Sequence, residues 1–442
     1  MDKQHENPLG VEPINHLMAR FAIPSIIAML VSALYNMVDQ FFIGHSVGMQ
    51  GNAATNVAFP LTITCTAVSL LFGIGGAANF NLSMGRKKPE EAKHFIGNAI
   101  FLMLSFGITL CLLVFLFLDP LLKLFGATAD ILTYSRTYTS ITAFGFPFVI
   151  LATGGSNLVR ADGSPNFSMA CTLIGFIFVF HMGMAGAAWA TIIGQIISAS
   201  MVIWYLTRFK TVKLTLKELR PRAFACRRIL SLGMSPFLNQ LAIMIVQVVM
   251  NNVLVFYGGQ SVYGSEIPLA CAGIISKVNM IFFSISIGLS QGMQPIASFN
   301  YGAENYGRVR EAVIKTMTAS TLICTVAFIL FQLFPRQITG IFGSGSEEYF
   351  TFASRYFRIF LFFTFLNGIQ PVAGNFFTAI GKPVYGIFIS LTRQILFLLP
   401  LILILPQFFG IDGVLYSAPI ADFMAAVLAF FLTFRQLNKL GK

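Results

Sequence analysis

The segments AIPSIIAMLVSALYNMVDQ, residues 22–40, and GMSPFLNQLAIMIVQVVMNN, residues 233–252, decide how this chain is organised. Both are apolar runs that contain a proline and end in polar side chains. Fifteen positions separate Pro24 from Asp39, and fifteen separate Pro236 from Asn251. A spacing shared by two segments so far apart in the chain indicates an internal repeat.

Three more pairs of segments support this repeat, because they follow one another in the same order. They are 81–93 (NLSMGRKKPEEAK) with 298–312 (SFNYGAENYGRVREA), 159–165 (VRADGSP) with 377–383 (FTAIGKP), and 186–195 (GAAWATIIGQ) with 413–422 (GVLYSAPIAD). We therefore expect two related halves.

The composition predicts that both halves lie in a membrane. Of the 442 residues, 56% are hydrophobic and 10% are charged, whereas soluble proteins carry about 25% charged residues. Apolar runs of about twenty residues, the length of a membrane-spanning helix, recur along the chain. We expect an all-α integral membrane protein with twelve spans, near residues 17–43, 55–84, 95–117, 138–160, 166–180, 187–206, 233–256, 267–299, 312–333, 356–379, 384–408 and 414–434.

The basic residues predict the orientation of the chain. Segment 208–228 holds eight Lys and Arg residues and one acid, whereas segments 44–54 and 257–267 hold no Lys or Arg. Because basic loops stay in the cytoplasm, we expect a multi-pass protein of the cell membrane (the bacterial inner membrane) with both termini cytoplasmic. The net charge of +12 then reflects topology, and we expect no nucleic-acid partner. The predicted domains are an N-terminal six-helix lobe (1–206), a basic linker (207–228) and a C-terminal six-helix lobe (229–442).

The fifth span of the first half is shorter than its match in the second half. Pro165 and Gly186 are 21 positions apart, whereas their counterparts Pro383 and Gly413 are 30 positions apart. Nine residues of the second copy therefore have no counterpart in the first.

The gap falls between Gly175 and Phe176. The remaining apolar run, 166–180, would form a helix of about 22 Å against about 30 Å of hydrocarbon. Since the alternation of basic loops requires it to cross, we expect a shortened fifth helix. Two explanations stay open: the gap is native, or the sequence omits residues of a complete parent.

Four motifs along the chain resemble those of a known family. They are Pro24…Asp39-x-x-x-x-Gly44 in the first span, Gly85-Arg86-Lys87 after the second, Arg160-Ala161-Asp162-Gly163-x-Pro165 after the fourth, and Gly186-Ala187-Ala188…Thr191 at the start of the sixth. As an ordered set they resemble the multidrug and toxic compound extrusion (MATE) exporters, on the MepA/DinF-like bacterial branch.

This resemblance implies a fold and a mechanism. Two six-helix lobes would form a V-shaped, alternating-access antiporter that exchanges lipophilic or cationic drugs for protons or sodium. The coupling site would lie in the first lobe, with Asp39 as its acid and with Thr191 and Asn157 as further polar members. The family's fifth helix normally adds an Asn and, four residues later, an Asp before a proline. By spacing, these belong in the gap after Gly175, so this chain lacks part of the implied site.

Asp39 is also a candidate from its own surroundings. An ionised carboxylate costs at least about 2.5–3.5 kcal/mol at the bilayer centre, so such residues usually face the protein interior and are often functional. Tyr35 and Asn36 precede Asp39 by four and three positions, which places all three on one helical face. The group could bind and release a proton, or sodium through its oxygens. Alternatively, a neutral carboxyl simply holds helices together.

The second half has polar candidates of its own. Asp422 and two buried cations, Lys277 and Arg393, lie within apolar runs. Either the cations pair with Asp422 or backbone carbonyls and stabilise the lobe, or the group forms a second charge-switching site. Amides in the seventh and eighth spans either line the substrate cavity or join helices, at about 0.6–2 kcal/mol per bond; the cavity candidates are Gln247, Asn251, Asn252, Gln291 and Gln294.

These observations favour a secondary exporter over an enzyme. No Walker loop or H-E-x-x-H sequence is present, and the six cysteines form no C-x-x-C pair that would indicate a metal site. We expect a monomer without a cofactor other than the coupling ion, H⁺ or Na⁺, with small drugs and membrane lipid as partners. Two alternatives remain: a lipid-linked saccharide flippase of the same superfamily, and a degenerate protein that does not transport because its fifth helix is short.

Overall fold

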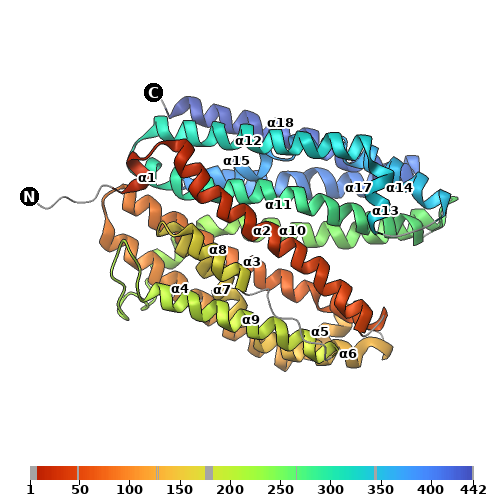
Figure 1. Cartoon of the computed structure of the whole chain (residues 1–442), viewed down its shortest axis with the longest axis horizontal. Helices are drawn as coiled ribbons and strands as arrows, with labels where there is room; N and C mark the ends of the chain where they lie inside the picture. The colour runs from red at the N-terminus through yellow and green to blue at the C-terminus, as the bar shows by residue number, and fades with distance from the viewer. Residues whose placement is uncertain are drawn as a thin grey trace, which may run out of the picture.

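The computed structural model describes residues 7–46, 49–125, 127, 129–174, 183–264, 266–342 and 346–440. All regular elements in these ranges are helices (Figure 1), as the apolar runs predicted. The helices of the first half are α1 (Pro8–Val11), α2 (Ile14–Ser46), α3 (Met49–Gly85), α4 (Pro89–Leu116), α5 (Leu118–Leu124), α6 (Ala129–Phe144), α7 (Phe146–Ala161), α8 (Pro165–Ile174) and α9 (Gly183–Leu206).

The second half follows a similar order. Its helices are α10 (Ala223–Gly259), α11 (Glu266–Gly302), α12 (Tyr306–Leu333), α13 (Pro335–Phe342), α14 (Glu347–Phe360), the 3₁₀ helix η1 (Thr364–Leu366), α15 (Ile369–Ala379), α16 (Pro383–Leu391), the π-helix η2 (Thr392–Leu398), α17 (Leu399–Phe409) and α18 (Ile411–Lys439).

Eleven of the twelve predicted spans have a counterpart among the described helices. Nine helices are long and apolar enough to cross a membrane, and two bent pairs bring the number to 11. The first pair, α6 and α7, bends by 53° at Gly145, and the second, α14 with η1–α15, bends by 42°. Pro147, which has no N–H to donate, lies in the first turn of α7 and Pro371 in that of α15, so proline coincides with both breaks.

The fifth predicted span is described only in part. Its helix α8 ends at Ile174 after 10 residues, a length of about 15 Å. The rest of the predicted crossing, including the gap after Gly175, lies outside the described residues. With Pro165 matched to Pro383, the end of α8 corresponds to Thr392, where the π-helix of the second half begins.

The first long helix of each half begins in the hydrophobic core of the other half. Leu9, Leu17 and Phe21 of α1 and α2 belong to a hydrophobic core built mainly from α11, α12, α15 and α18. Conversely, Ala225 and Ile229 of α10 belong to the core of α3, α4 and α7. In Figure 1, α2 accordingly starts beside α11 and α12 and runs diagonally toward the other group of helices.

The start of α1 and the end of α18 lie at one end of the molecule, here called the termini end (Figure 1). The halves meet there through glycines that allow helix backbones to touch. A Cβ added at Gly288 or Gly292 of α11 would lie 2.6 Å from the Cα of Ile26 or Ala22 in α2. A Cβ at Gly233 of α10 would overlap the carbonyl oxygen of Leu71 in α3. We call these close approaches the glycine seam.

Candidate functional site

Two of the predicted coupling residues are in direct contact. The hydroxyl of Tyr35 in α2 lies 3.0 Å from that of Thr191 in α9, within hydrogen-bonding distance. Asp39 lies one turn further along α2, and its side chain, like that of Asn36, lies outside the described residues. The structure therefore brings together two of the predicted members and places the backbone of the acid next to them.

Asn157 lies at a different depth from this pair. A Cβ added at Gly155, on the same helix, would touch Val202 of α9, which is eleven positions beyond Thr191. Eleven helical residues correspond to about 16 Å. The side-chain amide of Asn157 donates to the carbonyl of Thr153 instead, at 3.1 Å. The structure does not bring Asn157 to the Tyr35–Thr191 pair.

Arg160 connects the two lobes, and the sequence interpretation missed this role. Its guanidinium donates to the side-chain carbonyl oxygen of Gln291 in α11 at 2.8 Å and makes a longer contact, 3.4 Å, with that of Asn157. Arg160 is only 5% exposed. The available signal in the sequence was an arginine directly after a largely apolar run, at the start of RADGSP. Such an arginine, if buried, requires a polar partner.

The predicted cavity amides separate into different surroundings. Gln247 donates to Asn251 at 3.0 Å on one flank of α10, whereas Asn252 is exposed and donates to the carbonyl of Val248. Gln294 of α11 is buried, and its amide nitrogen has no hydrogen-bond partner among the described residues. With Gln291 engaged by Arg160, the five residues do not form one continuous polar surface.

Two of the three charged residues predicted in the second lobe form an ion pair. Nε of Arg393, in the π-helix, donates to Oδ1 of Asp422 in α18 at 2.6 Å, and the Asp422 side chain is 2% exposed. The predicted pairing is thus confirmed for Arg393. It is wrong for Lys277, which is exposed on α11 rather than buried. A long, flexible side chain can extend to solvent from an apolar helix, which the sequence pattern does not reveal.

Asp162 fastens the basic linker to the first lobe. Its carboxylate accepts hydrogen bonds from the Tyr205 hydroxyl, from the backbone N–H groups of Lys210 and Thr211, and from the Thr211 hydroxyl. Burial raises the pKa of this carboxyl above its ordinary value, although the donated bonds act in the opposite direction. Among the described residues, no cluster of three His, Cys, Asp or Glu could hold a metal ion.

The arrangement of two related lobes has counterparts among known proteins. A sequence model of the MatE family matches residues 24–202 and 241–404, which together are most of the chain. The chain belongs to the MatE family. Within it, the multidrug export protein MepA of Staphylococcus haemolyticus is 25% identical over 434 residues, which cover 96% of this chain and 94% of the relative. MepA of Staphylococcus aureus strain MSSA476 is 23% identical over 439 residues, covering 97% and 95%.

Solved structures of the family share the fold. A MATE family transporter of the MOP superfamily in an outward-facing conformation superposes with a TM-score of 0.91 at 20% identity, over 100% of both chains. A MATE structure described as the bent conformation superposes with a TM-score of 0.87, also at 20% identity, over 97% of this chain and 96% of that one. Members of this family fold as twelve helices in two lobes, which confirms the predicted fold class.

Proposed function

We propose that this protein is a secondary active exporter that moves lipophilic or cationic drugs out of the cell in exchange for protons or sodium. Membership of the MatE family, with relatives named multidrug export proteins, carries this proposal. A membrane carboxylate on the first helix, Asp39, couples export to the ion. It lies one turn from the Tyr35–Thr191 contact, which joins the first helix to the sixth predicted span.

The glycine seam supports alternating access between the two lobes. The seam closes the termini end through backbone contacts between α2 and α11 and between α10 and α3. Arg160 adds a hydrogen bond to Gln291 across the same boundary. Export would require these contacts to separate so that a drug enters from the termini side, which we expect to be cytoplasmic.

The residues missing from the fifth helix favour one coupling ion over the other. A sodium site needs several oxygen ligands, whereas a proton needs a single carboxylate. Because this chain lacks the acid and amide that the family's fifth helix supplies, we favour protons.

Ethidium efflux from pump-deficient cells tests the proposal. Cells expressing the chain are loaded while de-energised and then re-energised, beside cells expressing Asp39→Asn and the control Glu348→Gln, an exposed acid at the far end of the molecule. We expect efflux from the wild type and the control but not from Asp39→Asn. Equal efflux from all three would remove Asp39 from the mechanism.

The same assay decides what the short fifth helix does. A variant with nine apolar, helix-forming residues inserted after Gly175 restores the length of the matching span. If only this variant exports ethidium, the chain as written is an incomplete pump. If no variant exports although all reach the membrane, the proposed export activity is wrong, and the flippase and the non-transporting protein are the alternatives left to test.

A further inference from the structure

A cavity at the termini end lies between the two halves of the chain, outside the site described above. Its volume is about 260 Å³. One wall comes from the first turns of α4 and the other from the start of α10; the lining residues are Glu90, Glu91, His94, Phe95, Arg222, Phe224 and Ala225.

The walls of this cavity are held in place by the linker. Oδ1 of Asn98, one turn beyond the cavity on α4, accepts the backbone N–H of Arg222 at 2.6 Å. The amide of Asn98 donates to the carbonyls of Glu218 and Arg220 at 3.2 and 3.3 Å. Next to it, a Cβ on Gly97 would collide with the Glu218 carbonyl. The position of Arg222 is therefore fixed by the fold.

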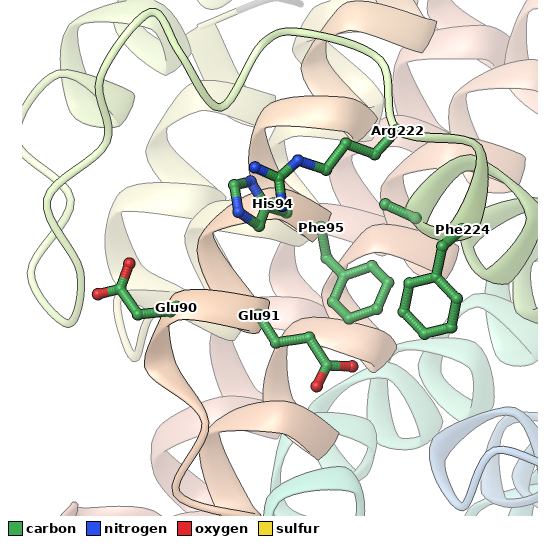
Figure 2. Close-up of a pocket in the computed structure, with 7 residues that line it drawn as sticks. Glu90, Glu91, His94, Phe95, Arg222 and Phe224 are labelled. Carbon is green, nitrogen blue, oxygen red and sulfur yellow. The ribbon is translucent and has the colours of Figure 1, made fainter.

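The cavity has opposite charges on its two sides and aromatic rings between them. In Figure 2, Arg222 lies beside His94, Glu91 lies on the other side, and the rings of Phe95 and Phe224 lie between. The two ring centroids are 6.3 Å apart. Within the described part of the chain, neither the Arg222 guanidinium nor the Glu91 carboxylate forms a hydrogen bond or ion pair. Both charges are therefore free to bind a ligand.

The other acid of the cavity is already occupied. Glu90 points away from the rings in Figure 2, and its carboxylate pairs with Lys93 at 2.5 Å. A ligand in the cavity therefore meets the Arg222 guanidinium, the Glu91 carboxylate, the His94 ring and the Phe224 ring, over which the Arg228 guanidinium also lies at 5.2 Å.

The depth of the cavity in the membrane narrows the choice of ligand. Apart from Thr109, the exposed side chains of α4 from Leu104 to Leu116 are apolar. A hydrocarbon layer of about 30 Å that starts at Leu116 ends near Ile96, twenty residues along the helix. Residues 90–95 then lie in the following 9 Å or so, the layer of lipid headgroups.

We propose that this cavity binds the headgroup of a phospholipid that carries both a phosphate and a primary ammonium, as phosphatidylethanolamine does. The Arg222 guanidinium would donate paired hydrogen bonds to the phosphate, a geometry that suits arginine. Glu91 would accept from the ammonium, and the glycerol region would cover the exposed ring of Phe224, beneath which Phe95 is buried. A choline headgroup has no N–H to donate to Glu91, and a glycerol headgroup has no cation.

Native mass spectrometry of the full chain in detergent tests the site directly. The protein is incubated with phosphatidylethanolamine, phosphatidylcholine or phosphatidylglycerol of identical acyl chains, and the retained lipid is counted. Glu91→Gln and Arg222→Gln are compared with matched controls away from the cavity, Glu348→Gln and Lys217→Gln, both at exposed positions.

We expect the wild type and both controls to retain phosphatidylethanolamine in preference to the other two lipids. Glu91→Gln should lower its retention to the level of phosphatidylcholine. Arg222→Gln should lower retention of all three about tenfold or more, because a hydrogen bond to a charged group is lost. Equal retention of the three lipids by the wild type, or cavity variants indistinguishable from the controls, would overturn the proposal.

Soluble phosphoethanolamine distinguishes a lipid from a free solute. If it displaces the bound lipid at equal concentration, the cavity recognises a small zwitterion and the lipid assignment is wrong. Because the readout is retained lipid, failure of ethidium efflux leaves this result intact, and loss of lipid binding leaves the export proposal intact.

Discussion

At the scale of single residues, the contact between Tyr35 and Thr191 joins the first helix to the sixth predicted span beside the proposed coupling acid. A neutral hydrogen bond contributes about 1 kcal/mol to stability. We expect Tyr35→Phe and Thr191→Val each to lower the free energy of unfolding, with the double variant falling short of their sum by about 1 kcal/mol. Denaturant unfolding in detergent measures this, and strictly additive losses would show that the two hydroxyls do not interact.

Variants that remove the charges of Arg393 and Asp422 test whether this ion pair stabilises the fold or takes part in transport. Removing one partner of a buried pair leaves an uncompensated charge, so Arg393→Gln and Asp422→Asn should each destabilise the protein by about 3–5 kcal/mol. The double variant should regain most of that loss. If it also regains ethidium efflux, the pair is structural. A double variant that folds but does not export would identify the second charge-switching site.

Single residues differ in how far the sequence could predict them. Asp39 stood out because a carboxylate in an apolar run is rare. The residues that share its helical face followed from their spacing in the sequence. The contact of Arg160 with Gln291 joins residues 131 positions apart, and periodicity shows which face of a helix is polar but not which helix it meets. Lys277 and Arg393 look alike in the sequence, yet only the latter reaches Asp422.

At the scale of helices, the glycine seam is the feature that a single added methyl group should disturb. A Cβ at Gly233 would overlap the Leu71 carbonyl oxygen, whereas one at Gly273, on α11, meets no atom within 4 Å. Overpacking costs about 1–3 kcal/mol, so Gly233→Ala should shift the balance between closed and open termini ends about fivefold or more. Gly273→Ala should leave it unchanged.

Distances between spin labels measure this shift. Labels replacing Lys88 and Arg310, in a cysteine-free background, report the separation of the two lobes at the termini end. Gly233→Ala should add a longer distance to the distribution seen with Gly273→Ala. Identical distributions for the two variants would show that the seam does not control opening.

The helices themselves were largely predictable, since a membrane requires about twenty apolar residues for each crossing. The angle of the bend at Gly145 and the π-helix at Thr392–Leu398 were not predicted. A proline marks a break without giving its angle, and a π-helix depends on packing around α18 rather than on a local pattern. The shortened fifth span was inferred from offsets between repeats, and its described part, α8, ends at Ile174.

At the scale of the whole molecule, the packing of each half's first long helix into the core of the other half shows why domain boundaries are harder to derive than spans. The sequence places residues 1–206 in one lobe, but Leu17 and Phe21 pack into the core of the other half. Asn300 and Arg308 reinforce this by donating to the carbonyl of Leu9 at 2.8 and 3.1 Å. Hydropathy identifies these residues as buried without indicating the half of the chain that buries them.

The orientation of the whole molecule follows from its basic linker and can be tested with two exposed positions. Leu216, in the linker, is 83% exposed, and Val262, in the loop between α10 and α11, is 87% exposed. The positive-inside rule places the linker in the cytoplasm and the loop outside. In a cysteine-free background, a membrane-impermeant maleimide should label Val262→Cys in intact cells but Leu216→Cys only after permeabilisation. The reverse pattern would place the termini end outside, and the glycine seam would then close the exit for drugs instead of their entrance.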